Sequence, residues 1–141
     1  MRVMSRDAID LLRAIPIFSQ LDAQALGQVA SIASRLDAAK GSVLIERAQP
    51  GSGMFVILQG TVVVELRERT VELGAGEFIG ELSLLTDHVQ RSARVRATTD
   101  VSCLAIGRAE FTGLLEQHPR IAVPMLSGLA RRLLETVEQR T

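Results

Sequence analysis

Between residues 36 and 106 the sequence divides into short segments rich in β-branched residues, and turn residues separate them. The predicted strands are SVLIER, MFVILQ, TVVVEL, TVEL, SARVRA and VSCLAI. Seven of the eleven glycines fall between residues 41 and 80, at positions 41, 51, 53, 60, 74, 76 and 80. Short strands with turn signals at this spacing are typical of an all-β barrel or sandwich.

Helical periodicity flanks this central region on both sides. Before it, apolar residues recur at helical spacing on either side of Pro16, and Ser5 and Asp22 are suitable N-caps, so two short helices are expected. After it, Pro119 suits a first helical turn, and Pro124 should bend or restart the last helix. The predicted fold class is therefore α+β, with helices, then a β barrel, then helices.

The composition indicates an ordinary globular domain. The 141 residues fit one domain, and the 16 basic and 16 acidic residues cancel, so the chain lacks the basic excess of an autonomous nucleic-acid-binding domain. Cys103 has no second cysteine to pair with and is expected to be a small core residue. No long apolar run or signal peptide is recognisable, so we expect a cytoplasmic chain without a membrane span.

The stretch FIGELSLLTDHVQRSARVRA, residues 78–97, places a positive charge on an inward face. Side chains alternate faces along a strand, so Arg91 shares its side with Ala93, Val95 and Ala97. An unpaired guanidinium in a core costs several kcal/mol, on the order of what a whole domain has to spare. Something anionic must therefore meet Arg91.

The residues around this arginine suit one phosphate group. Gly80 and Glu81 precede LSLLT, a predicted helical turn whose start presents free backbone N–H groups to an anion. Arg91 and Ser92 add a guanidinium and a hydroxyl. Glu81 would repel a phosphate, but a sugar hydroxyl would satisfy it. The residues alone leave a second reading open, in which Glu81 and Arg91 pair with each other inside the barrel.

The segments GEFIGELSLL and RSARVRATTD together resemble the phosphate-binding cassette of cyclic nucleotide-binding domains, in the form found in the catabolite activator protein family. The resemblance extends over nearly the whole chain. It implies one cyclic nucleotide-binding domain over residues 5–141, built on an eight-stranded antiparallel β roll. Its parts would be N-terminal helices at 5–34, the roll at 35–107 with its cassette at 78–93, and the B and C helices at 108–140.

The resemblance also implies roles for individual residues. Glu81 would accept the ribose 2′-hydroxyl, and Arg91 would pair with the cyclic phosphate. The other implied phosphate and ribose contacts are Gly80, Leu82, Ser92 and Ala93. The apolar wall around the sugar and base would include Val64, Leu73 and Ile79, which plain core packing would equally explain. The chain departs from many members at Gln90, where they have proline.

The last helix is expected to read the base. Thr136 matches a family threonine that contacts adenine, and Arg132 shares its helix face. Val137 replaces a polar residue that reaches the base from a partner subunit. The spacing of Leu126, Ala130, Leu133 and Val137 is that of a short coiled-coil seam, which would make a homodimer. Alternatively, this stripe merely covers the roll.

Catalysis is not expected, because no nucleophile accompanies a histidine base and no metal-ligand cluster is recognisable. His88 and His118 are isolated, and His88 in the cassette loop is expected to be solvated surface rather than a haem ligand. Activator proteins of the family continue into a DNA-reading helix-turn-helix, whereas this chain stops at Thr141, so direct DNA binding by this chain is not expected.

Two functional classes remain. The first is a cyclic nucleotide sensor, with cyclic AMP as the expected ligand and cyclic GMP open, whose last helix passes occupancy to a partner or fused effector. The second is a degenerate interaction domain that binds no nucleotide. The presence of Glu81, Arg91 and Ser92 together favours the first class.

Overall fold

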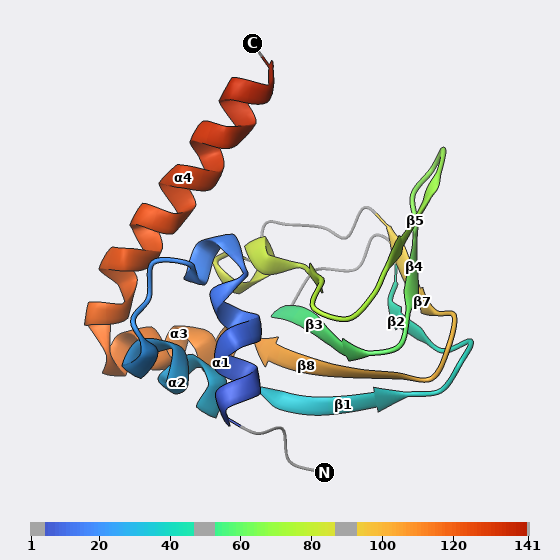
Figure 1. The fold of residues 1–141 in the computed structure, drawn as a ribbon, viewed down its shortest axis with the longest axis horizontal. Helices are drawn as coiled ribbons and strands as arrows, with labels where there is room; N and C mark the ends of the chain where they lie inside the picture. The colour runs from blue at the N-terminus through green and yellow to red at the C-terminus, as the bar shows by residue number, and fades with distance from the viewer. Residues whose placement is uncertain (1–4, 47–52, 87–92, 141) are drawn as a thin grey trace. The chain divides into compact units, whose positions relative to one another are not determined.

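A computed structural model describes residues 5–46, 53–86 and 93–140 of the chain (Figure 1). The described residues form two compact units. The helical unit contains residues 5–32 and 110–140, and the β unit contains residues 33–109. No helix among the described residues is long and apolar enough to cross a membrane.

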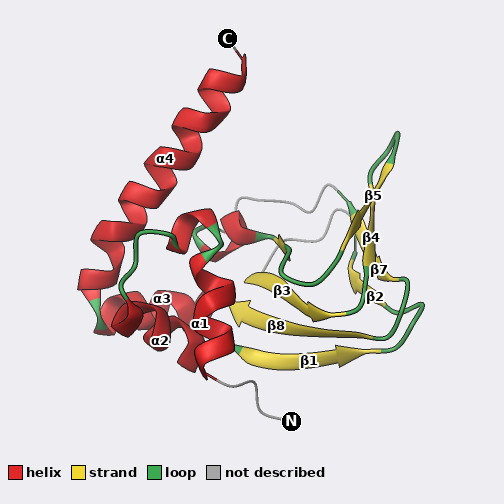
Figure 2. Cartoon of the chain, viewed as in Figure 1, coloured by secondary structure: helices red, strands yellow, loops and turns green. Residues whose placement is uncertain are grey.

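The helical unit contains both predicted helical regions (Figure 2). Its elements are α1 (Ser5–Arg13), the 3-10 helix η1 (Pro16–Phe18), α2 (Ala23–Ser31), the 3-10 helix η3 (Pro119–Ile121) and α4 (Ala122–Arg140). Helix α3 (Arg108–Gln117) has its first two residues in the β unit and the rest in the helical unit. As predicted, Pro16 separates the first two α-helices, and Asp22 caps α2, its Oδ1 accepting the Ala25 N–H at 2.8 Å. The rings of Phe18 and Phe111 pack at 5.9 Å between centroids in the core of this unit.

The prediction for Pro124 needs a correction. We expected this proline to bend or restart the last helix, whereas Pro124 is the third residue of α4, which begins at Ala122. In the first turn of a helix the backbone N–H groups have no intrahelical acceptor, so a proline there loses no hydrogen bond. The last α-helix starts at Ala122, two residues before Pro124 and directly after η3.

The β unit consists of eight antiparallel strands in two four-stranded sheets, which confirms the predicted fold class. One sheet has the order β1–β8–β3–β6 and the other β2–β7–β4–β5. The strands are β1 (Ser34–Ala38), β2 (Val43–Ile45), β3 (Gly53–Gln59), β4 (Val62–Glu65), β5 (Thr70–Leu73), β6 (Phe78–Ile79), β7 (Arg94–Ala97) and β8 (Val101–Gly107). Two of them, β1 and β6, were not among the six segments predicted as strands.

Residues of both sheets form the core of the β unit. The buried cluster consists of Ile45, Ile57, Val62, Val95, Ala97, Val101 and Cys103. It includes Cys103, as predicted, and burial raises the pKa of this thiol, with a smaller contribution from the negative charge of Asp37. These residues belong to β2, β3, β4, β7 and β8, so the cluster joins the two sheets.

Strand β7 has the alternation that the sequence predicts. Val95 and Ala97 are buried, whereas Arg94 and Arg96 are exposed on the other face. The exposed arginines form surface ion pairs, Arg94 Nε with Glu46 Oε1 and Arg96 Nη2 with Glu65 Oε1, both at 2.7 Å. The odd-numbered residues of β7 therefore point inward, as the prediction for Arg91 assumed. Arg91 itself lies outside the described residues.

Candidate functional site

The helical turn predicted at LSLLT, residues 82–86, is the 3-10 helix η2 (Glu81–Leu84), which starts one residue earlier than predicted and is separated from β6 by Gly80. Gly80 precedes it with a left-handed backbone, φ 85° and ψ 23°, a conformation that glycine adopts without the penalty of a Cβ atom. The Ser83 N–H donates to the Gly80 carbonyl at 3.0 Å and closes the first turn. Gly80 thus sets the direction in which Glu81 enters the turn.

Buried polarity is concentrated in this turn. The buried polar or charged residues of the described part of the chain are Glu81, Ser83 and Ser102, and two of these three lie in η2. Glu81 is 5% exposed, and the Ser83 hydroxyl is buried without a hydrogen-bond partner among the described residues. Because burying polar groups costs free energy, their concentration in a four-residue turn makes η2 a candidate for a binding site.

The residues of the predicted apolar wall border the core of the β unit. Val64, Leu73 and Ile79 are partly buried and pack against the core cluster of the β unit. They come from β4 and β5 of one sheet and β6 of the other, and each contacts the same cluster. Their packing is established, and their contact with a ligand stays a prediction.

The other cassette residues are placed in part. Leu82 is 40% exposed in η2, and its backbone contact with a ligand stays a prediction. Ala93 is buried directly before β7. Arg91, Ser92, Gln90 and His88 lie outside the described residues.

The two residues predicted to reach the base belong to the helical unit. Thr136 is exposed in α4, and its hydroxyl donates to the Arg132 carbonyl at 3.1 Å, one helical turn earlier. Serine and threonine often form this bond in helices. The base contacts of Arg132 and Thr136 stay predictions.

Sequence reasoning missed one residue at the site. Arg108, the first residue of α3, donates from Nη1 to the Ser83 carbonyl at 3.4 Å and to the Thr86 carbonyl at 3.3 Å. A positive charge is unfavourable at the start of a helix, where the macrodipole is also positive. That mismatch was the available sequence signal that Arg108 serves another element.

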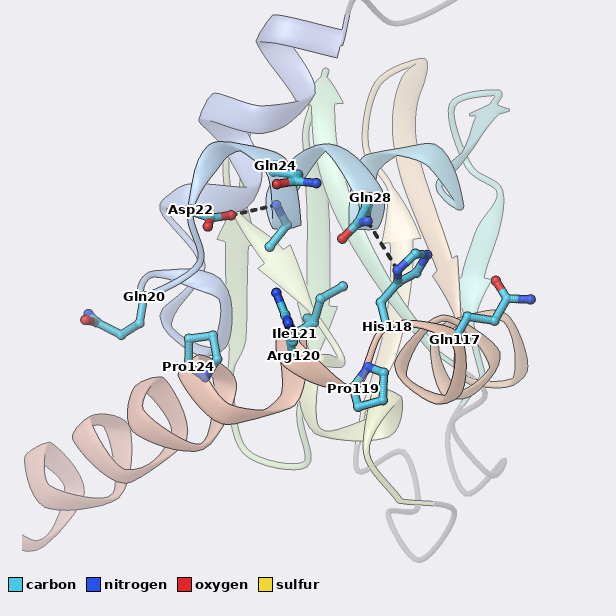
Figure 3. A pocket seen from close by; sticks show the side chains of 11 residues that line it. Gln20, Asp22, Gln24, Gln28, Gln117, His118, Pro119, Arg120, Ile121 and Pro124 are labelled. Atoms are coloured by element: carbon cyan, nitrogen blue, oxygen red, sulfur yellow. Dashed lines mark hydrogen bonds between the residues drawn. The ribbon is translucent and has the colours of Figure 1, made fainter.

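A separate groove of about 610 Å³ lies within the helical unit (Figure 3). Its lining includes Gln20, Gln24 and Gln117, and Gln28 Nε2 lies 3.4 Å from His118 Nδ1. His118 therefore contacts an amide side chain, which is not a nucleophile. The groove contains none of the residues predicted to bind the nucleotide, and among the described residues no group of three or more His, Cys, Asp or Glu could hold a metal ion.

Comparison with known proteins agrees with this geometry. The family model described as "Cyclic nucleotide-binding domain" matches residues 35–118, which include η2 and all eight strands except the first residue of β1. The chain belongs to the cyclic nucleotide-binding domain family. The family resemblance predicted from the cassette is thereby confirmed.

The relatives of this cyclic nucleotide-binding domain include a channel and a transcriptional regulator. A cyclic nucleotide-gated potassium channel of Rhizobium etli is 36% identical over 112 residues, which cover 79% of this chain and 31% of the channel. The cAMP-activated global transcriptional regulator CRP of Salmonella typhimurium is 33% identical over 104 residues, which cover 70% of this chain and 50% of the regulator. The chain thus spans about a third to a half of these two relatives.

A solved structure is similar over almost the whole domain. The N-terminal domain of a transcriptional regulator from Streptomyces coelicolor A3(2) superposes with a TM-score of 0.82 at 33% sequence identity. The match covers 90% of this chain and 94% of that one.

Proposed function

We propose that this domain binds a cyclic nucleotide, cyclic AMP in preference to cyclic GMP, and acts as a regulatory rather than a catalytic module. The observation that carries the proposal is the buried carboxylate of Glu81 at the start of η2, immediately after the left-handed Gly80. A regulator described as cAMP-activated and a channel described as cyclic nucleotide-gated are among the relatives, which supports the same class of ligand.

Each part of the nucleotide has a chemically suited partner in this proposal. The Glu81 carboxylate accepts the ribose 2′-hydroxyl, a neutral donor that a buried carboxylate attracts. Backbone groups of Gly80 and Leu82, with Ser92 and Ala93, donate to the cyclic phosphate, and Arg91 neutralises its charge. The phosphate partners Arg91 and Ser92 come from the family resemblance, since both lie outside the described residues. The sugar and base then lie against the apolar wall of Val64, Leu73 and Ile79.

We place the output of the domain on α4. The residues of the predicted seam, Leu126, Ala130, Leu133 and Val137, are all exposed, which supports a surface that pairs with a second copy or with an effector. Thr136 lies on the same helix and is the predicted reader of the base. The effector would be a partner protein or a domain fused to this one. From the sequence evidence alone, the cytoplasm is the expected location of this chain.

Titration calorimetry of the purified chain with cyclic AMP and cyclic GMP tests the proposal. We expect cyclic AMP to bind more tightly, and Arg91→Ala to weaken binding about 10- to 150-fold, the value of a charge-assisted contact. The melting temperature of the ligand-free Arg91→Ala variant should stay close to that of the wild type. Arg67→Ala, in the exposed turn between β4 and β5, is the matched control and should bind as the wild type does.

The degenerate alternative predicts the reverse pattern. If Arg91 exists to pair with Glu81, its removal leaves a buried carboxylate without its counter-charge, and the melting temperature falls while neither nucleotide binds the wild type. Tighter binding of cyclic GMP than of cyclic AMP would contradict the proposed preference for adenine.

A further inference from the structure

The guanidinium of Arg108 closes the end of the turn that carries Glu81. Within η2, the Gly80 carbonyl accepts the Ser83 N–H at 3.0 Å, and the Leu82 carbonyl accepts the N–H groups of Leu85 at 3.1 Å and Thr86 at 3.3 Å. The last carbonyls of a helical turn have no acceptor role within it and need outside donors. Arg108 Nη1 donates to one such carbonyl, that of Ser83, and also to the Thr86 carbonyl, two residues beyond the end of η2.

The charge of Arg108 suits this position. A cation near the C-terminal end of a helical turn interacts favourably with the carbonyl dipoles, and an arginine side chain can hydrogen-bond the last carbonyls directly. The two bonds, at 3.4 and 3.3 Å, share one nitrogen and are partly buried. The charge that is unfavourable at the start of α3 is therefore favourable at the end of η2.

The backbone of Arg108 is held by the sheet. It follows β8 directly, and β8 pairs with β3 up to its last residue, Gly107, which lies opposite Gly53. The turn η2 lies against the same strand β3. Residue 53 must be small, because a Cβ atom there would clash with the Ile106 carbonyl, so β3 and β8 approach closely at this point. Arg108 thus extends from a fixed strand end to the turn of the site.

We propose that Arg108 is a positioning residue, which holds η2 in the orientation that presents Glu81 to the ribose. The inference rests on the proposed function, because it assigns Glu81 to the 2′-hydroxyl of a cyclic nucleotide. Arg108 itself touches no ligand in this proposal.

The test compares Arg108→Met with Arg108→Lys in the full chain. Methionine keeps an unbranched side chain but removes the donors, whereas lysine keeps the charge and a donor. Binding of cyclic AMP and of 2′-deoxy cyclic AMP is measured for each variant, together with backbone amide exchange of Leu85 and Thr86 in the ligand-free protein. Arg67→Met, an exposed arginine in a surface turn, is the matched control.

We expect Arg108→Met to lose about ten-fold in affinity for cyclic AMP, the size of one charge-assisted hydrogen bond, and much less for 2′-deoxy cyclic AMP. The preference for the 2′-hydroxyl therefore shrinks, and exchange at Leu85 and Thr86 becomes faster. Arg108→Lys should recover part of both effects. A merely structural role would weaken the two nucleotides equally.

Equal losses for the two nucleotides, or unchanged exchange in η2, would overturn the inference. A wild-type chain that binds neither nucleotide would instead overturn the proposed function, and the ribose role of Arg108 with it. In that case the amide exchange of Leu85 and Thr86 in Arg108→Met would still show whether Arg108 holds η2. Failure of the proposed function and failure of the Arg108 inference are therefore distinguishable.

Discussion

Gly128 of α4 lies directly against the backbone carbonyl of Pro16 in η1. A Cβ atom at position 128 would be 2.7 Å from the Pro16 oxygen and 3.2 Å from the Ile17 oxygen. Both obstacles are backbone atoms, which cannot rotate away as the end of a long side chain can. The absence of a side chain at Gly128 therefore allows α4 to pack on η1 within the helical unit.

Gly128→Ala should destabilise the chain. Alanine favours a helix over glycine by about 1 kcal/mol, but overpacking against fixed backbone costs roughly 1–3 kcal/mol, so the net effect is a lower free energy of unfolding. Gly113→Ala in α3 is the matched control, because a Cβ atom there meets nothing within 4 Å. Urea unfolding should show a loss for position 128 and an unchanged or higher stability for position 113. A gain at both positions would contradict the close packing of α4 on η1.

The Cys103 thiol should be unreactive in the folded chain. Its side chain is buried in the core cluster, and burial, together with the nearby charge of Asp37, raises the pKa of the thiol, so little of the reactive thiolate is present. A thiol reagent at pH 8 should label native protein at least about 100-fold more slowly than protein in urea, since core strands open only with a cost of several kcal/mol. Rapid labelling of native protein would show that β8 opens readily.

The sequence was most informative where a local rule decides the structure. The alternation of Val95 and Ala97 with Arg94 and Arg96 predicted the two faces of β7, and Asp22 predicted the start of α2. The segment LSLLT after Gly80 and Glu81 predicted a helical turn, which η2 forms from Glu81 to Leu84. Each of these features depends on neighbours in sequence, so a pattern of residues can reveal it.

The remaining features depend on distant partners. Strand β1 contains Arg35 and Asp37 and has little strand propensity of its own, but it pairs with β8 along its whole length, and the Ser102 hydroxyl donates to Asp37 at 2.7 Å. Strand β6 has two residues, too few for any periodicity to appear. Arg108 is 22 and 25 residues from the carbonyls that it binds, so its unfavourable charge at a helix start could signal a role elsewhere, but no local pattern could identify its partners.

Asp37 should make stability depend on pH in the acid range. The Ser102 hydroxyl and then Arg35 hydrogen-bond its carboxylate and lower its pKa below the ordinary value of 3.8. A group whose pKa is lowered by folding stabilises the folded chain above its unfolded pKa and loses this contribution as the pH falls through the folded value. The urea midpoint of the wild type should therefore exceed that of Asp37→Asn at pH 6.

The same difference should disappear once the pH falls through the lowered pKa of Asp37 in the folded chain, which lies below 3.8, because the wild-type carboxyl is then protonated as well. The carboxylate is exposed, so the difference at pH 6 should be small and should shrink in high salt. A difference that persists unchanged at low pH would mean that the asparagine substitution disturbs the β1–β8 pairing for a reason other than charge.

The exposed seam of α4 should control self-association. Leu126 and Leu133 are each 65% exposed and lie on the predicted seam, whereas Leu134, at 61%, is equally exposed but lies outside its spacing. If two copies pair through the seam, Leu133→Glu should shift the sedimentation equilibrium toward monomer, because a charge in an apolar interface is costly. Leu134→Glu is the matched control and should leave the equilibrium nearly unchanged. Equal behaviour of both variants would contradict pairing through this face.

Binding of cyclic AMP should slow amide exchange in the second half of α4. From Ala130 to Glu138 the helix is exposed apart from the half-buried Arg132, so little packing protects its hydrogen bonds and local opening should be frequent. A ligand shifts such an equilibrium only through contacts that differ between the two states. The Thr136 hydroxyl, which donates to the Arg132 carbonyl, is free to exchange that bond for one to the base. Exchange across α4 should therefore fall with saturating cyclic AMP, whereas α2, as the internal control, should not change. Unchanged exchange in α4, with binding confirmed by calorimetry, would mean that another element carries the output.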